Sequence, residues 1–285
     1  MNPLEPALDN LFERLNFYNF LITYIDKRLT NLKSDIERRA GKSEKVGVED
    51  LMHGTSLIIT DLSGPTDGGW LYQYSTGNFD VEGEDYLQML NEFVGREAER
   101  VVAQGYEAFE TYLYDVTARF CDAKSEQSLV DHFKGNLPKA PDRDLEAWKK
   151  AVRGVYRRKP NSDLVDLIRN LGQDLGKAEV HTNNRGLDLA RWYQIAGEVR
   201  HAVTHSEGVI SSKVIEGFDR KEIRVLRKNY PGAKTDEGYA LQLDVDSAQQ
   251  ALRTFAEYGY SIFKALSEER GYDWVYLPGQ DERAT

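Results

Sequence analysis

The chain has 285 residues, a mass of 32.5 kDa and a formal net charge of −10. Hydrophobic residues make up 40% and charged residues 29%, a composition typical of folded proteins that excludes an intrinsically disordered chain. The acidic balance argues against a protein that coats nucleic acid by bulk charge, because such binding relies on clustered Lys and Arg. The lone Cys121 excludes an internal disulfide. With no secretory leader pattern and no run near the ~18 apolar residues of a membrane span, we expect a cytoplasmic protein without membrane contact.

Hydrophobic periodicity in the first half of the chain predicts two long helices. Apolar residues recur at three- and four-residue steps from Leu8 to about Arg39, and again, most strongly, from Asp85 to Phe120. Between them, residues 41–78 lose this period and carry Gly-rich turns around the short apolar run 56–59. We expect loops there, with one short strand or helix.

The second half predicts shorter helices and one hairpin. Asp144 offers an N-cap for a helix ending at Tyr156, and Asn161 or Ser162 caps a helix that runs to Leu175. Further helical patterns cover Leu187–His205 and a last helix that is capped by Asp244 or Asp246 and ends before Gly271. Residues 222–245 alternate in character and predict a β-hairpin with strands 223–226 and 239–243, joined by a turn containing Pro231 and Gly232.

These elements define a mainly α protein with a small β-hairpin. We divide the chain into an N-terminal helix and irregular extension, residues 1–84, and a helical domain, residues 85–285. The two segments could also form one compact unit.

The chemistry suggested by the sequence is concentrated in one segment. The chain has no Walker-type phosphate loop, nucleophile elbow or dinucleotide fingerprint. Two of its five histidines, His201 and His205, stand four residues apart on the helix predicted for 187–205. This is a zinc-binding spacing, but the zincin motif HExxH needs a glutamate where this chain has Ala202. Metal-dependent hydrolysis is therefore disfavoured.

The hexapeptide Arg-His-Ala-Val-Thr-His, residues 200–205, fits the pattern R-x4-6-H with a polar residue after the arginine. It follows a long earlier helix that includes residues 101–113. In these respects the chain resembles the HEPN domains, and residues 198–208 resemble the motif helix of uncharacterised and abortive-infection HEPN-like proteins. The resemblance covers roughly residues 85–270; residues 1–84 resemble no family that we can name, and the hairpin at 222–245 would be an insertion.

This resemblance implies an antiparallel helical bundle and a metal-independent endoribonuclease of a defence or toxin-type system, without a cofactor. It also implies a homodimer, in which two motifs face each other to form the site. A histidine side chain titrates near pH 6.5, so His205 can exchange protons with RNA near neutral pH. The Arg200 guanidinium can hold the scissile phosphate, while His201 or a residue of the second subunit supplies the remaining contact.

Helix geometry limits how this motif can work. Residues five apart lie about 140° apart around an α-helix, so Arg200 and His205 cannot share one face. Either the helix loosens before Ser206, or a second copy of the motif completes the site. The homodimer is the favoured alternative.

A structural interpretation of the same residues remains open. Arg200 could pair with Glu198, Glu207 or an acid of another helix, and His205 could stabilise a helix C-terminus. Glu107 and Glu110 could face the motif, although a solvated position is more common for such residues. The second candidate function is thus a non-catalytic helical module that binds a protein or nucleic-acid partner, including a protein inhibitor.

Residues 149–159 form a basic run with six positive and no negative charges. Its members Lys149, Lys150, Arg153, Arg157 and Arg158 are candidate contacts to nucleic acid. The alternative is a solvated helix face, which is the usual role of such a run.

Overall fold

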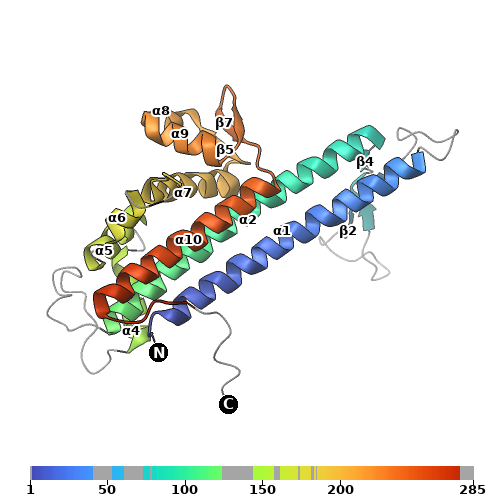
Figure 1. Ribbon diagram of the computed structural model, residues 1–285. Helices are drawn as coiled ribbons and strands as arrows, with labels where there is room; N and C mark the ends of the chain where they lie inside the picture. The colour runs from blue at the N-terminus through green and yellow to red at the C-terminus, as the bar shows by residue number, and fades with distance from the viewer. Residues whose placement is uncertain are drawn as a thin grey trace, which may run out of the picture. The chain divides into compact units, whose positions relative to one another are not determined.

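The computed structural model describes residues 2–40, 53–60, 73–77, 79–81, 83–123, 144–156, 161–172, 174–180, 183 and 185–276, and most of them are helical (Figure 1). The expectation of a mainly α protein is therefore confirmed. Small antiparallel sheets accompany the helices. Among the described helices, none is long and apolar enough to cross a membrane.

The chain forms two units. Unit 1 contains Met1–Ile22 and Glu97–Thr285, and unit 2 contains Thr23–Arg96. Helix α1 (Glu5–Ala40) and helix α2 (Gly83–Asp122) each contribute to both units. The boundary that we expected at residue 84 falls inside unit 2, within α2.

Unit 2 joins parts of these helices to two small sheets. Lys33 of α1 donates a hydrogen bond to Asn91 of α2. Strand β1 (His53–Thr55) pairs with β4 (Phe79–Val81), and β2 (Ile58–Thr60) pairs with β3 (Gln73–Ser75). For the region 41–78 we expected loops with one short strand or helix; its described residues instead include three short strands, β1, β2 and β3. Much of this region lies outside the described residues.

Unit 1 is built around an aromatic core. Phe109 of α2 is fully buried, and its ring centroid lies 5.1 Å from that of Tyr193, 5.4 Å from Phe255 and 5.2 Å from Tyr258. These partners come from helix α7 (Leu189–His205) and helix α10 (Val245–Arg270). The single residue Phe109 therefore holds three helices together, and such ring contacts add to the free energy of burial.

The start of helix α4 (Leu145–Tyr156) and both ends of helix α10 lie at capping residues that the sequence offered. Asp144 accepts a hydrogen bond from the backbone of Ala147 at the start of α4. Asp244 caps α10, and Gly271 ends it in the left-handed conformation, with φ of 67°. Asp144 and Gly271 were predicted from the sequence, and of the two predicted candidates Asp244 and Asp246 it is Asp244 that caps the last helix. Such caps depend on local chemistry.

The predicted hairpin at 222–245 is wrong in its first strand. Residues 220–229 form helix α9, because Asp219 and Glu222 make a reciprocal capping box at its start. The hairpin consists instead of β6 (Gly232–Lys234) and β7 (Gly238–Leu241), so Pro231 and Gly232 do not form its turn. The third strand of this sheet, β5 (Val209–Ser211), pairs with the other edge of β7.

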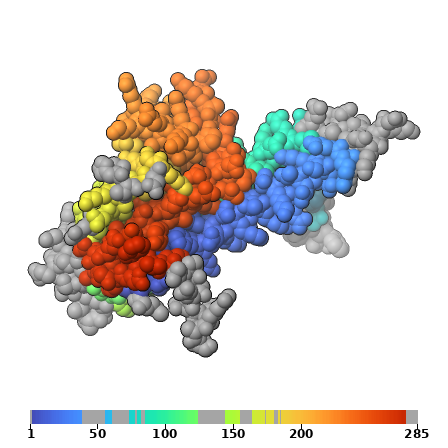
Figure 2. Space-filling model, in the orientation of Figure 1, coloured from blue at the N-terminus to red at the C-terminus, as the bar shows by residue number. Residues whose placement is uncertain are grey.

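Helix α8 (Ser212–Gly217) connects β5 to α9 and was not predicted. The sheet, α8 and α9 follow α7 directly in the chain. Their atoms form the orange lobe that protrudes from unit 1 (Figure 2).

The helix predicted to run from Asn161 to Leu175 is interrupted. Helix α5 (Asn161–Leu171) ends at Gly172, and a short helix α6 (Leu175–Val180) follows. A Cβ atom at Gly172 would lie 3.3 Å from the Cβ of Ala265, so the glycine permits close contact with α10. This tertiary contact is not visible in the hydrophobic period.

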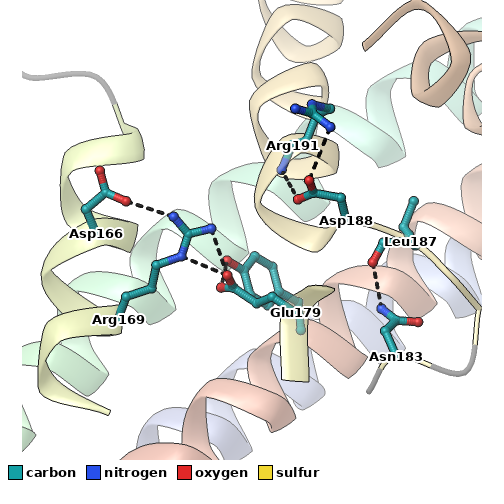
Figure 3. A network of polar contacts seen from close by, with 8 residues as sticks. Asp166, Arg169, Glu179, Asn183, Leu187, Asp188 and Arg191 are labelled. Atoms are coloured by element: carbon teal, nitrogen blue, oxygen red, sulfur yellow. Dashed lines mark hydrogen bonds and ion pairs between the residues drawn. The ribbon is translucent and has the colours of Figure 1, made fainter. Parts of the chain in front are cut away.

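A buried carboxylate fixes α6 between its neighbours. The fully buried Glu179 accepts two 2.8 Å contacts from the Arg169 guanidinium of α5 and a 2.5 Å hydrogen bond from the Tyr258 hydroxyl of α10 (Figure 3). Burial raises the pKa of the Glu179 carboxyl, while the hydrogen bonds from Tyr258 and Arg169 act in the opposite direction. Arg169 also pairs with Asp166, which is exposed.

We expect Glu179→Ala to lower the free energy of unfolding by about 2 kcal/mol. Removing one partner of a buried pair usually costs more, but Arg169 is one third exposed and solvent screens its charge. Urea denaturation followed by circular dichroism measures the change. The control is Asp166→Ala, which removes the exposed partner of the same arginine and should cost less than about 1 kcal/mol. Equal losses in both variants would contradict a special role for Glu179.

Candidate functional site

The motif residues lie at the C-terminal end of α7. Asp188 caps the start of this helix by accepting a 3.0 Å hydrogen bond from the backbone of Arg191. One side of the helix is buried and consists of Leu189, Trp192, Tyr193, Ile195, Ala196, Val199 and Ala202. His201 and His205, near the end of the helix, are therefore exposed, and Arg200 is partly exposed.

The two histidines form an exposed pair. The ring centroids of His201 and His205 are 5.0 Å apart, with 52° between the ring planes. Both side chains are exposed, as expected for residues four apart on the outer face of a helix. Solvent or a second molecule can reach both imidazoles at once.

The Arg200 side chain does not join the histidine pair but contacts helix α2. Its NH2 atom lies 3.1 Å from the Glu107 carboxylate of α2, and the two side chains are 33% and 48% exposed. The Arg200 Nε atom is buried without a hydrogen-bond partner among the described residues. Arg200 thus forms an ion pair with an acid of another helix, which was one of the interpretations left open by the sequence. That acid is Glu107.

A glycine explains why α7 comes so close to α2 at this point. A Cβ atom at Gly197 would lie 3.3 Å from the Tyr106 hydroxyl, and Tyr106 stacks on Tyr193 at 5.0 Å between ring centroids. Arg200 lies three residues after Gly197, and Glu107 follows Tyr106. This contact between helices therefore places the guanidinium beside the carboxylate.

The helix does not loosen before Ser206. Helix α7 continues to His205, and the Ser206 N–H donates to the Ala202 carbonyl at 2.9 Å. Arg200 and His205 consequently keep the separation of about 140° that an α-helix imposes. The first alternative for the motif, loosening of the helix before Ser206, is therefore not observed. One chain alone does not bring the Arg200 and His205 side chains onto a single phosphate.

The basic run is only partly described. Lys149, Lys150 and Arg153 lie on α4, whereas Arg157 and Arg158 lie outside the described residues. Lys149 pairs with Asp115 and with Glu146, both at 3.1 Å. Lys150 and Arg153 are exposed.

One hollow of unit 1 lies away from Arg200, His201 and His205. It has a volume of about 640 Å³ and is lined by α6, α10 and the segment between α6 and α7, including Arg185 and Glu257, which form an ion pair. None of Arg200, His201 and His205 lines it. Within the described ranges, no group of three or more His, Cys, Asp or Glu side chains is placed to hold a metal ion.

Searches against protein-family models, curated proteins and solved structures returned no match to this chain.

We expect Glu107→Gln to change the free energy of unfolding by less than about 1 kcal/mol, because both partners of this ion pair are partly exposed and solvent screens their attraction. Urea denaturation measures the change, with Glu179→Ala as the comparison variant. A loss above about 2 kcal/mol would mean that the ion pair with Arg200 holds α7 against α2.

Proposed function

We propose that the chain is a HEPN-like, metal-independent endoribonuclease of a defence or toxin type, and that it acts as a homodimer. Arg200 and His205 are its catalytic residues, and His201 assists. The observation that supports this most is the position of Arg200, His201 and His205 at the C-terminal end of a helix that has one buried side, with both histidines exposed and Arg200 partly exposed.

These side chains suit cleavage of RNA without a metal ion. The imidazole of His205 accepts the proton of a ribose 2′-hydroxyl, and the 2′-oxygen attacks the adjacent phosphorus. The bond from phosphorus to the 5′-oxygen breaks, and that oxygen takes a proton from a second acid. His201 or a group of the second subunit supplies this proton, leaving a 2′,3′-cyclic phosphate and a 5′-hydroxyl.

Arg200 stabilises the negative charge on the phosphate during this step. A guanidinium carries five N–H donors, and the described structure shows a Glu107 contact at the NH2 atom alone. A phosphate can therefore bind beside the carboxylate or displace it. Because Arg200 and His205 diverge on one helix, we place the Arg200 of one subunit opposite the His205 of the other.

The second candidate function is a non-catalytic module that binds a protein or nucleic-acid partner. The ion pair between Arg200 and Glu107 favours it, because a paired arginine can serve the packing of α7 on α2 alone. Many folds carry unrelated functions, so the resemblance by itself does not decide between the two.

The first experiment is cleavage of total RNA by the purified chain in EDTA, beside His205→Ala. We expect products with 2′,3′-cyclic phosphate ends, and a loss of at least about 100-fold in rate in the variant, as for removal of a general base. Thr204→Ala is the matched control, since Thr204 is an exposed neighbour whose hydroxyl bonds only the Arg200 carbonyl, at 2.7 Å, in the described structure. No cleavage by a folded dimer, or equal cleavage by His205→Ala, would favour the binding module.

A mixing experiment tests the shared site. Arg200→Ala and His205→Ala should each be inactive alone. If each site takes its arginine and its histidine from different subunits, half of the randomly mixed dimers contain one intact site, which restores about one quarter of the wild-type rate. Co-refolding the two variants from urea and measuring cleavage gives the result. No recovery, with mixed dimers verified by mass, would contradict a site shared in this way.

A further inference from the structure

A second, smaller hollow lies between three helices of unit 1. It has a volume of about 100 Å³, several times the space that one water molecule needs. Its polar lining comes from Asn10 and Arg14 of α1, Thr111, Tyr112 and Asp115 of α2, and Lys149 and Arg153 of α4. Three cations from two helices that are far apart in sequence thus meet around one small concavity.

The charge of this hollow is positive. Its one acid, Asp115, is already engaged by Arg119 at 3.2 Å and by Lys149 at 3.1 Å. Within the described part of the chain, Arg14 and Arg153 pair with no acid, and Arg14 makes only a long 3.4 Å contact to the Tyr18 hydroxyl. Two guanidinium groups therefore remain to bind an anion, and guanidinium forks match the geometry of phosphate oxygens.

Helix α2 connects this hollow to the Arg200 site. Glu107, which pairs with Arg200, lies four residues before Thr111, and the Thr111 hydroxyl donates to the Glu107 carbonyl at 2.8 Å. Asp115 lies four residues further on. At 1.5 Å per residue these positions span about 12 Å along one side of α2, which corresponds to roughly two to four nucleotides of a strand.

We infer that this hollow binds a backbone phosphate of the RNA strand, a few nucleotides from the phosphate held by Arg200. Arg14 and Arg153 provide the contacts, and Lys149 offsets the charge of Asp115. The identity of the ligand as RNA rests on the proposed function, whereas the affinity of the hollow for phosphate does not. The same geometry gives Lys149 and Arg153, two of the basic residues of α4, a specific role in binding phosphate.

The test uses a short RNA with 2′-O-methyl groups, which cannot be cleaved, and fluorescence anisotropy. We expect the full-length double variant Arg14→Gln/Arg153→Gln to bind it at least about tenfold more weakly than wild type. The dependence of log affinity on log salt should flatten by about 1.4, which is two lost contacts at about 0.7 each for a single strand. Arg224→Gln, an exposed arginine of α9, is the matched control.

Replacing single phosphates of this RNA with neutral methylphosphonates locates the contact. A methylphosphonate at one or two positions should weaken binding of the RNA to wild type and to Arg224→Gln. The same replacement should not change its binding to the double variant. If the double variant binds as tightly as Arg224→Gln, the inference is wrong even where His205-dependent cleavage is observed. If RNA binds through Arg14 and Arg153 but is never cleaved, the inferred phosphate binding is supported and the proposed nuclease function is wrong. If wild type binds no RNA, or binds an acidic peptide in its place, the inference is wrong.

Discussion

The packing of α7 and α10 around Phe109 of α2 is the constraint on which the rest of unit 1 depends. Three aromatic partners from α7 and α10 contact this ring, and two of them, Tyr193 and Tyr258, also take part in contacts that fix neighbouring helices. Tyr193 stacks on Tyr106, which sets the distance between α7 and α2, and Tyr258 binds the buried Glu179 of α6. The orientation of α7 about its own axis follows from this core, and with it the direction of every outward-facing side chain.

That orientation decides what the motif can do. Because the side of α7 that includes Val199 and Ala202 is buried, His201 and His205 face solvent while Arg200 reaches sideways to Glu107. The helix is regular through His205, so no local rearrangement brings the arginine and this histidine together. In the proposed function, the second copy of the chain supplies the side chain that one copy cannot place, so the proposal includes a dimer.

The sequence predicted those features that depend on local chemistry. The long helices and the caps at Asp144 and Asp244 follow from spacing and side-chain type, and the structure confirms them. The strand predicted at 223–226 is wrong because a short amphipathic helix and a short alternating strand have similar hydrophobic patterns. The capping box at Asp219, which distinguishes them, was overlooked. The partner of Arg200 lies 93 residues away, and the hollow joins α1 to α4. Such contacts arise from tertiary packing and leave no periodic signal.

The ion pair between Arg200 and Glu107 is compatible with catalysis as well as with a structural role. Since both partners are partly exposed, their attraction is worth at most about 1 kcal/mol, which lowers the affinity of Arg200 for a phosphate about fivefold. Hydrogen bonds from a guanidinium to a charged phosphate are worth about 1.5–3 kcal/mol, so a bound strand can compete with Glu107. Glu107 then keeps the guanidinium beside α2, in line with the hollow formed by Arg14 and Arg153, without closing the site. In the proposed complex, a strand that leaves Arg200 along α2 meets these two arginines next, so the three arginines define one path for the strand on each subunit.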